Sequence, residues 1–443
     1  MTAVASETTP FRALFEERQN RGERPDPPWL PVHRREAMER FEELGFPSTR
    51  MEEWRYTSTA SLARAPFVPP VPRNSHAVTV DLDLGGVPTS GRIVIANGRH
   101  APALSAGAPP IPGVRVSSLA ETLRRFPDRL APYLSQVAPV PGSAFPALNT
   151  ALFEDGVCVI ADPGAAPASP IHVVILADPD GARMATHPRV LVLAGRDSEV
   201  ALVEEYRGPD GADYWTNAVT EIVLQDGARV DRYKLQREGR QATHFGALCV
   251  EQGRDTRFAD HSFSVGGALS RQDIEVRLSA PGAECQLDGL FMVRGSQHAD
   301  THSRIDHVAP HCSSRELYKG VLDGSSRGVF HGRIVVRPGS QKTDAEQSNR
   351  NLLLSREALV HSTPQLEILA DDVKCKHGST TGQIDAAALF YLRSRGLDQA
   401  AARSMLTWGF AGELVARGRR DLRGCLEVVL REGLPGAAPE RAA

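Results

Sequence analysis

The stretches Gly324-Ser-Ser-Arg-Gly-Val329, Gly339-Ser-Gln-Lys342 and Arg356-Glu-Ala-Leu359 are variants of one short unit, in which a small or polar turn leads toward an apolar position. Successive copies begin 15 and 17 residues apart. The earlier variants Gly227-Ala-Arg-Val230 and Gly282-Ala-Glu-Cys285 begin 55 residues apart, which is about two spacings of 26 to 30. Recurrence at half and whole coil lengths favours a β-solenoid. Because the repeat is degenerate, a β-sandwich remains the alternative on periodicity alone.

The units lie in a region of short apolar runs, residues 149–384, that no helical stripe interrupts. Many short strands without intervening helices indicate a mainly β fold. The runs before residue 252 are Val157–Ile160, Ile171–Leu176, Val190–Leu193, Val200–Val203, Ala218–Leu224, Arg229–Leu235 and Ala247–Glu251.

The segments on either side of this core have a different pattern. Helical spacing of apolar residues predicts a helix over Val32–Leu44, ended by Gly45, and a second one over Leu119–Leu134. A short strand is predicted at Gly91–Ala96, and a proline-rich passage at 139–146 suggests a domain boundary. We therefore predict an N-terminal α/β domain over residues 1–148.

Three helices are predicted after the β region, in a C-terminal helical domain over residues 385–443. Asp385 can cap a helix over Ala386–Arg395, and Asp398 can cap one over Gln399–Arg417, which Gly418 ends. The third covers Asp421–Glu432. Such helices either close the end of a solenoid or present a docking surface to a partner. The apolar face of the second helix is formed by Ala402, Met405, Leu406, Phe410 and Leu414.

Composition excludes several classes of function. The 443 residues carry a net charge of −3, and this near-neutral balance argues against a large nucleic-acid footprint. No secretory leader or 20-residue apolar span is visible, so a cytoplasmic location is expected. The six cysteines are scattered, without the spacing of a zinc or iron–sulfur motif. Phosphate-binding loops and HExxH motifs are absent from the sequence.

Histidines gather between His298 and His311. On a strand, alternate residues share a face, so five polar residues of this run, two of them histidines, form one stripe. Two imidazoles and two carboxylates on one face can bind a divalent metal, shared between subunits in the best version of this hypothesis. The structural alternative, which we favour, is that the stripe stacks polar residues across neighbouring coils. Its members are His298, Asp300, His302, Arg304 and Asp306.

A second cluster is Asp371-Asp-Val-Lys-Cys-Lys-His377, in which Cys375 and His377 share one face of a strand. A thiolate beside Lys374 and Lys376 is expected to have a lowered pKa and to be a good ligand for a soft metal. Cysteine and histidine together suit iron or iron–sulfur chemistry. Two ligands are too few for a complete site, so a partner would have to supply the others.

The densest motifs of the chain resemble the SufB/SufD family. They are Leu317-Tyr-Lys-Gly-Val-Leu-Asp-Gly324, Gln341-Lys-Thr-Asp-Ala345, Asn351-Leu-Leu-Leu-Ser355, Ala370-Asp-Asp-Val-Lys-Cys375 and Ala388-Leu-Phe-Tyr-Leu-Arg-Ser-Arg-Gly396. The match is close over residues 298–415. Before residue 290 it is looser, apart from Glu52-Glu-Trp-Arg-Tyr56.

Two positions favour the SufD branch of this family. SufB-like chains resemble Cys-Gly-Ala-His-Thr where this chain reads Glu357-Ala-Leu-Val-His361-Ser-Thr-Pro364, without the cysteine. They also resemble Glu-His-Glu-Ala-Thr-Thr where this chain has Lys374-Cys-Lys-His-Gly-Ser-Thr380. Both differences agree with SufD-like chains.

The resemblance implies a right-handed parallel β-helix between an N-terminal α/β domain and a C-terminal helical domain. It also implies pairing with a SufB-type subunit through the β-helix, and docking of a SufC-type ATPase by the C-terminal helices. Candidate docking residues are Met405, Leu406, Trp408 and Phe410. The chain is then a non-catalytic scaffold subunit with no tightly bound cofactor of its own.

The family's cluster site corresponds to His377, with Cys375 beside it. A transient iron–sulfur cluster is expected there, shared with the SufB-type subunit. Whether a reduced flavin associates with the full complex stays open.

Two rival hypotheses stand beside this reading. The first is a homodimeric metal-binding scaffold that acts without SufB or SufC. The second is a carbohydrate-active β-helix enzyme with acid–base residues among Asp300, Asp306 and Asp323, which the cytoplasmic composition disfavours.

Overall fold

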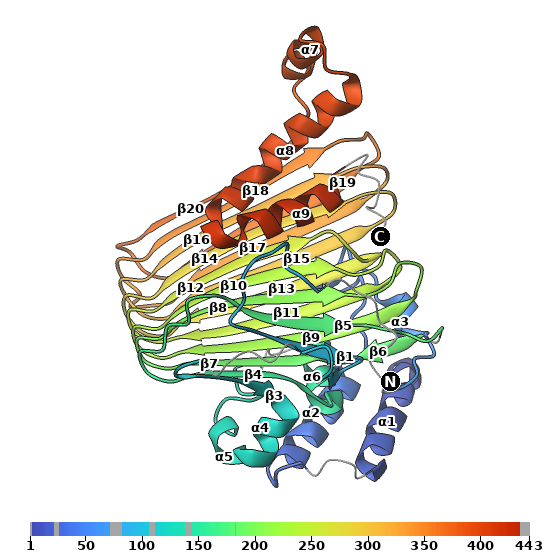
Figure 1. Cartoon of the computed structure of the whole chain (residues 1–443), viewed down its shortest axis with the longest axis vertical. Helices are drawn as coiled ribbons and strands as arrows, with labels where there is room; N and C mark the ends of the chain where they lie inside the picture. Colours follow the sequence, from blue (N-terminus) through green and yellow to red (C-terminus); the bar gives the residue numbers. More distant parts are fainter. Residues whose placement is uncertain are drawn as a thin grey trace.

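The computed structural model describes residues 2–21, 26–70, 82–105, 111–137, 143–181 and 183–434. Its body is a stack of long parallel strands, with helices gathered beneath one end and a helical arm rising beyond the other (Figure 1). Part of the proline-rich passage at 139–146 lies outside the described residues.

The strands belong to two sheets. The first sheet has ten strands, in the order β2 (Arg99–His100), β1 (Gly91–Ala96), β5 (Ile171–Leu176), β8 (Glu199–Arg207), β10 (Arg229–Arg237), β12 (Arg257–Ser264), β14 (Glu284–Val293), β16 (Ser313–Leu322), β18 (Asp344–Leu353) and β20 (Lys374–Gln383). The second sheet runs in the order β19 (Leu359–Ile368), β17 (Arg327–Val336), β15 (His298–His307), β13 (Leu269–Leu278), β11 (Thr243–Gln252), β9 (Tyr214–Leu224), β7 (Arg189–Ala194), β4 (Gly156–Ala161) and β3 (Val114–Ser118), with β6 (Met184–Thr186) beside β9.

From β8 onward the chain alternates between the two sheets, so each strand pairs in parallel with the strand two elements later. Arg229 of β10 lies in register with Arg257 of β12, and Arg257 with Glu284 of β14. A sandwich would join its strands mainly through antiparallel pairs. The parallel β-solenoid predicted from the repeat is therefore confirmed, and the sandwich alternative is wrong.

The recurring glycines turn the chain between coils. Gly227 and Gly282 adopt φ values of +74° and +78°, which residues with a side chain rarely tolerate. A Cβ on either glycine would also collide with an aspartate of the preceding coil, Asp197 or Asp255. Both the positive φ and the close contact with the preceding coil require glycine at these turns, which explains why the unit recurs with the coil length.

Apolar side chains fill the space between the two sheets. Their cluster runs from Ile93 and Val157 at one end through Phe258 and Ile305 to Ala345 near the other. Both faces of most solenoid strands are buried, because helices and loops cover much of the outer surfaces. Burial of this continuous core stabilises the stack of coils, since no single coil can bury its own apolar face.

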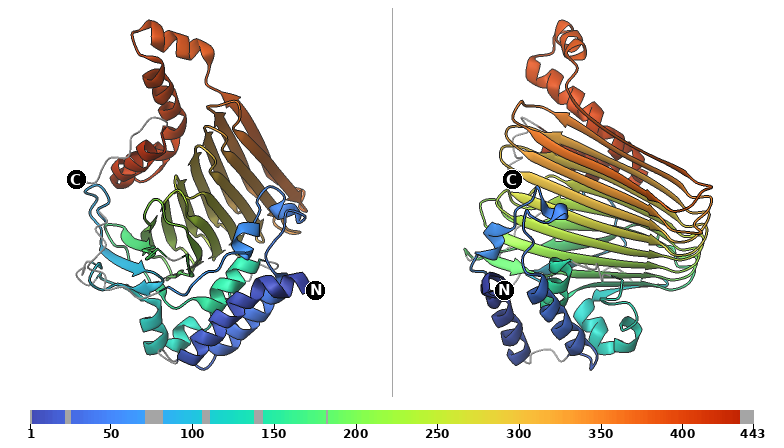
Figure 2. Two further views of the ribbon diagram at one scale, coloured as in Figure 1. Left: turned by 90° about the vertical axis from the view of Figure 1, so that its right-hand side faces the viewer. Right: turned by 180° about the vertical axis from the view of Figure 1, so that it is seen from behind.

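Helices close the first end of the solenoid (Figure 2). They are α1 (Thr2–Arg21), α2 (Leu30–Leu44), α4 (Leu119–Arg125), α5 (Pro127–Leu130) and α6 (Ala144–Leu152), with α3 (Ala60–Ala63) alongside. The helix predicted over Val32–Leu44 is α2, and Gly45 ends it by donating its N–H to Phe41 O at 2.8 Å. The helix predicted over Leu119–Leu134 is interrupted at Phe126, because Pro127 begins a new helix there.

Two segments of the predicted N-terminal region also contribute strands to the solenoid. β1 extends the first sheet in parallel with β5, and β3 pairs antiparallel with β4. α1 was not predicted from the sequence, although Phe11 and Phe15 are buried in the aromatic cluster beneath the solenoid. The division at residue 148 stays a prediction.

The C-terminal helices begin and end close to where the sequence indicates. Asp385 Oδ1 accepts from the N–H groups of Ala387 and Ala388 at the start of α7 (Ala386–Ser394), and Asp398 Oδ1 from that of Ala401 at the start of α8 (Gln399–Arg417). α9 (Arg423–Gly433) follows. α9 and the second half of α8 lie on the outer face of the first sheet, whereas α7 projects beyond the solenoid (Figures 1 and 2). In the described part of the chain, no helix is long and apolar enough to cross a membrane.

Candidate functional site

The second end of the solenoid is open. β19 and β20 are the terminal strands of the two sheets, and each pairs with one neighbour, β17 or β18. Their side chains are exposed or half-buried along their whole length, unlike those of the strands beneath them. This last coil therefore presents two strand edges and an uncovered interior to whatever binds there.

Cys375 and His377 lie on β20, in this last coil. Cys375 continues a register column in which Cys285, Ser314 and Ala345 precede it, and it is half-buried against the solenoid core. His377 is two residues along the same strand, so it shares that inward face, and it is exposed. The two predicted ligands are thus brought together at the mouth of the solenoid interior.

The expected activation of Cys375 by neighbouring lysines is wrong. Burial raises the pKa of the Cys375 thiol, with a further contribution from Asp344. Lys374 and Lys376 are adjacent to Cys375 in sequence and so point to the opposite face of the strand. The Lys376 ammonium lies 3.0 Å from a carboxylate oxygen of Glu346 instead.

Beneath His377, two polar side chains continue inward along the first sheet. Gln347 of β18 is in register with His377, and Glu316 of β16 is in register with Gln347. Burial raises the pKa of Glu316 to about 7. Neither residue is predicted as a site residue from the sequence, because inward and outward positions look alike on strands that are buried on both faces.

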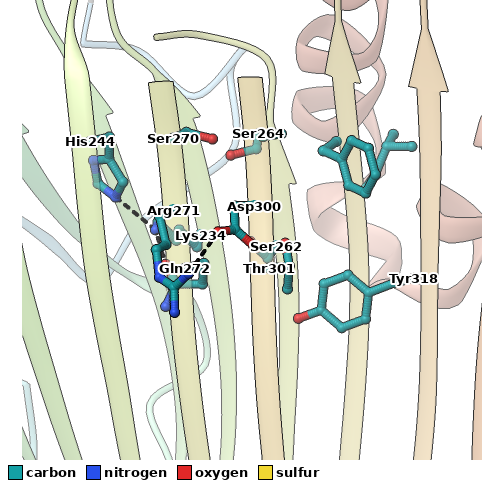
Figure 3. A pocket seen from close by; sticks show the side chains of 13 residues that line it. Lys234, His244, Ser262, Ser264, Ser270, Arg271, Gln272, Asp300, Thr301 and Tyr318 are labelled. Atoms are coloured by element: carbon teal, nitrogen blue, oxygen red, sulfur yellow. Dashed lines mark hydrogen bonds and ion pairs between the residues drawn. The ribbon is translucent and has the colours of Figure 1, made fainter. Parts of the chain in front are cut away.

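Deeper in the interior, Lys234 lies in a small enclosed pocket of about 10 Å³ (Figure 3). Its ammonium is 2.8 Å from His244 Nε2 and also contacts Gln272. Burial lowers the pKa of Lys234 to about 7, with nearby Arg232 acting in the same direction. A volume of this size holds one water molecule. The interior of the solenoid therefore contains ionisable groups that hydrophobic patterning does not reveal.

The predicted histidine stripe lies on the outer face of β15, where it receives an N-terminal segment. Thr57 Oγ1 donates to Asp300 Oδ2 at 2.6 Å and lies 2.9 Å from His298 Nε2. Arg271 of β13 bonds Asp300 at 2.7 Å and donates to the backbone carbonyl of Glu53 at 2.8 Å. The stripe thus holds the Glu52–Thr57 segment against the solenoid.

Electrostatics support a structural role for this contact. Burial opposes ionisation of Asp300, but Arg271 and His302 outweigh it and hold the pKa of this carboxyl well below its usual range. The Arg271 guanidinium also lies over the Trp54 ring, 3.7 Å from its centroid. A buried carboxylate with a paired guanidinium and a hydroxyl donor is satisfied, and it is not free to act as a general acid.

A groove of about 680 Å³ runs along the same outer face, next to the Glu53–Trp54 segment. Arginines and carboxylates line it in nearly equal numbers, and several are paired with each other. Arg337 bonds Asp306 through two N–H groups at 2.8 and 2.7 Å. The lining has no strong charge of one sign that would select an anionic or cationic ligand.

The four predicted docking residues on α8 differ in exposure. Met405 is 53% exposed, whereas Leu406, Trp408 and Phe410 are half-buried. Trp408 and Phe410 contact the apolar cluster between the helices and the first sheet. The buried Lys319 of β16 donates to Phe410 O at 2.7 Å and to Glu413 at 2.6 Å, which fixes this part of α8. Among the large apolar side chains that the structure describes, the two most exposed are on α7, where Phe390 is 74% and Tyr391 55% exposed.

In the described ranges, no three His, Cys, Asp or Glu side chains converge closely enough to hold a metal ion. Cys375 and His377 together provide two donors of the kind that iron prefers. These two donors alone are too few for a complete metal or cluster site.

Comparisons with known proteins cover almost the whole chain. Residues 175–410 match the family described as SUF system FeS cluster assembly, SufBD core domain, and residues 5–173 match the SufBD protein N-terminal region. The chain is 32% identical over 387 residues to the iron–sulfur cluster assembly SufBD family protein slr0076 of Synechocystis, with 84% of each chain covered. It is 31% identical over 405 residues to the iron–sulfur cluster assembly protein SufD of Escherichia coli, with 89% of this chain and 90% of SufD covered. It is 29% identical over 380 residues to the chloroplastic protein ABCI7 of Arabidopsis thaliana, with 84% and 79% covered.

Proposed function

Because the chain belongs to the SufBD family of iron–sulfur cluster assembly proteins, we propose that it is a SufD-type scaffold whose last coil pairs with a SufB-type subunit. In this proposal a nascent cluster is built between the two subunits. His377 and Cys375 are the contribution of this chain to the cluster site.

The open end of the solenoid is the observation that carries the proposal. Within the described part of the chain, β19 and β20 each leave one edge without a strand partner, and exposed edges of this length are templates for pairing with another chain. The opposite end is closed by helices. Pairing across the last coil would cover the free edges and enclose the side chains that face the mouth of the interior, including His377.

The donor set supports a shared site rather than a resident one. A thiol and an imidazole on one strand are suitable ligands for iron, but they leave most of its coordination positions to other groups. The cluster is then cargo that is held transiently between subunits. Since Cys375 is half-buried with a raised pKa, His377 is the more accessible of the two ligands.

The helical arm is the proposed docking surface for a SufC-type ATPase. α7 has no buried residue, and its Phe390 and Tyr391 are exposed together with Met405 of α8. Apolar side chains gathered in this way on a projecting element are typical of a protein-binding site. We assign these roles to three domains, 1–148, 149–384 and 385–443. In the described part of the last domain, α7 projects beyond the solenoid and α9 packs on the outer face of the first sheet.

We infer that the chain is not an enzyme by itself. Two of the three acidic residues of the carbohydrate-active alternative are already paired, Asp300 with Arg271 and Asp306 with Arg337. A glycosidase needs two carboxyl groups that face one substrate cleft and have different pKa values. Asp300 is buried beneath the N-terminal segment, where no sugar could reach it.

A homodimeric metal-binding scaffold remains a second candidate, because the same free edges can pair with a second copy of the chain. It predicts that the purified chain alone binds iron tightly. The scaffold proposal predicts instead that the chain co-purifies with SufB-type and SufC-type subunits, and that removal of residues 385–434 abolishes ATPase binding.

The decisive experiment is reconstitution of cluster assembly with purified subunits. We expect His377→Ala to leave the complex intact and to reduce cluster formation by about tenfold or more, since a ligand to the cargo is lost. Lys376→Ala is the matched control, because this neighbour points to the opposite face of β20 and pairs with Glu346. An unchanged rate in the His377→Ala complex would exclude His377 from the cluster site.

A further inference from the structure

A column of side chains leads from the open end into the solenoid. Glu316, Gln347 and His377 occupy successive coils of the first sheet in direct register. Glu316 is 2% and Gln347 1% exposed, whereas His377 is exposed at the mouth. Two fully buried polar groups therefore lie directly beneath the residue proposed to contact the cluster.

The contacts within this column fix the orientation of the Gln347 amide. Its Nε2 donates to Glu316 Oε2 at 2.6 Å. A Cβ on Gly332 of β17 would collide with this amide, so the glycine leaves room for the glutamine across the interior.

One atom of the column is left without a partner. Gln347 Oε1 is buried and accepts no hydrogen bond from any described residue. Because Nε2 already donates to Glu316 on the coil below, Oε1 is the amide atom left for a donor on the coil above, where His377 is in register with Gln347. A buried amide oxygen without a donor is costly, so a donor on the next coil would satisfy it.

We propose that Gln347 is a positioning residue for His377, with Oε1 accepting the inward ring N–H of the imidazole and Glu316 locking the amide in that orientation. The importance of this hydrogen bond for cluster assembly rests on the proposed function, whereas the hydrogen bond itself is inferred from the column of side chains alone. A neutral imidazole has one N–H and one lone pair, so fixing the N–H inward directs the lone pair outward. Metal-binding histidines are commonly oriented by such a hydrogen bond from their second nitrogen.

The arrangement makes Glu316 an indirect contributor. If Glu316 is replaced by an apolar side chain, the amide can rotate and offer Nε2 instead of Oε1 to the histidine. A purely structural glutamine would fill the space over Gly332 and have no effect on the tautomer of His377. The tautomer ratio of His377 therefore distinguishes a positioning role of Gln347 from a packing role.

The test uses the full-length chain alone, labelled with ¹⁵N at histidine. The signals of His377 are identified as those missing from His377→Ala, and its tautomer ratio is read from the ring ¹⁵N shifts. We expect one dominant tautomer in the parent chain. Gln347→Met and Glu316→Met should each shift the ratio about fivefold, the equivalent of one hydrogen bond. Glu316→Gln keeps an acceptor for Nε2 and should preserve the ratio.

Ser362→Ala is the control variant, since Ser362 bonds Ser379 in the same last coil but is not part of the column. An unchanged tautomer ratio in Gln347→Met overturns the proposal. A near-equal mixture of the two tautomers in the parent chain also overturns it, and that measurement does not depend on the folding of any variant. Reconstitution distinguishes this result from failure of the proposed function. If one His377 tautomer dominates but the His377→Ala complex assembles clusters at the normal rate, the contact between Gln347 and His377 is supported and the role of His377 as a cluster ligand is excluded.

Discussion

Thr57 donates a 2.6 Å hydrogen bond to Asp300 although 243 residues separate the two in the chain. The contact joins the segment after the first helices to the outer face of the solenoid. Arg271 completes it by bonding Asp300 and by covering the Trp54 ring. The histidine-rich strand therefore has a clear structural role in holding the N-terminal segment in place.

Replacing Thr57 by valine should loosen this contact with little change in side-chain volume. A hydrogen bond to a buried charged group contributes about 1.5–3 kcal/mol, so the free energy of unfolding should fall by that amount. Amide exchange should rise across Glu52–Trp54, the segment that Asp300 and Arg271 hold. Thr59→Val is the control, because Thr59 donates to the neutral backbone carbonyl of Pro47 at 2.6 Å. Equal exchange in the two variants would contradict the proposed anchor.

Asp300 should also shape the acid stability of the protein. Its pKa is lower in the folded chain than in the unfolded chain, so its contribution is present above the unfolded pKa and is lost as pH falls through the folded value. In Asp300→Asn, urea unfolding should therefore show lower stability at neutral pH and a shallower loss of stability below about pH 4. If the free energy of unfolding fell equally with decreasing pH in the parent chain and in Asp300→Asn, Asp300 would be excluded as a source of the acid sensitivity.

The sequence was most informative where a residue has one local task. The capping aspartates Asp385 and Asp398 and the turn glycines Gly227 and Gly282 are recognisable because their backbone positions demand those residue types. The family motifs then identified the solenoid correctly. α1 escaped prediction because its apolar residues do not form a regular stripe and Pro10 lies within it.

The interior polar groups could not be predicted in the same way. Alternation of polar and apolar residues indicates a strand with one solvent-exposed face, but Glu316 and Lys234 lie on strands that are buried on both faces. Their neighbours come from coils about 30 residues away, as with Glu316 and Gln347. The expected effect of Lys374 and Lys376 on Cys375 is wrong for a related reason, since the side chains of sequence neighbours on a strand point to opposite faces.

Glu316 should make stability depend on pH in the opposite direction to Asp300. Burial raises its pKa from 4.5 to about 7, so its contribution is fully present below the unfolded value and is lost as pH rises through 7. This shift corresponds to roughly 3 kcal/mol between pH 4.5 and pH 8. Glu316→Gln should remove that dependence in urea unfolding measured across this range. Glu346→Gln, at the adjacent half-exposed face of the solenoid, should keep it.

Lys319 should control how firmly α8 is attached to the solenoid. Its buried ammonium bonds Phe410 O and Glu413, and it lies 4.6 Å from the centroid of the Phe410 ring. Lys319→Met keeps the length of the side chain but removes these contacts, so amide exchange should increase over residues 405–413. Arg350→Met is the control, because Arg350 reaches the same Glu413 only at 3.5 Å from an exposed position and exposed ion pairs contribute about 0–1 kcal/mol. Similar exchange in both variants would show that Lys319 does not anchor the helix.

Phe390 on α7 should be essential for binding the ATPase and dispensable for folding. Its side chain is 74% exposed, and α7 has no buried residue, so a charge at this position leaves the core of the chain untouched. Truncation of a central aromatic residue in a protein interface commonly costs 2 kcal/mol or more, which corresponds to roughly thirtyfold in affinity. We therefore expect Phe390→Asp to weaken binding of the SufC-type subunit by at least about this factor, measured by calorimetry, with an unchanged unfolding midpoint.

Val428→Asp is the matched control for Phe390→Asp. Val428 is 43% exposed on α9, which lies on the outer face of the first sheet away from the projecting arm. A general sensitivity of the C-terminal helices to charge would weaken ATPase binding equally in both variants, whereas docking on the arm requires the loss to be confined to Phe390→Asp. Full affinity in the Phe390→Asp chain would move the docking surface away from α7. The half-buried face of α8, with Leu406 and Trp408, would then be the next region to test.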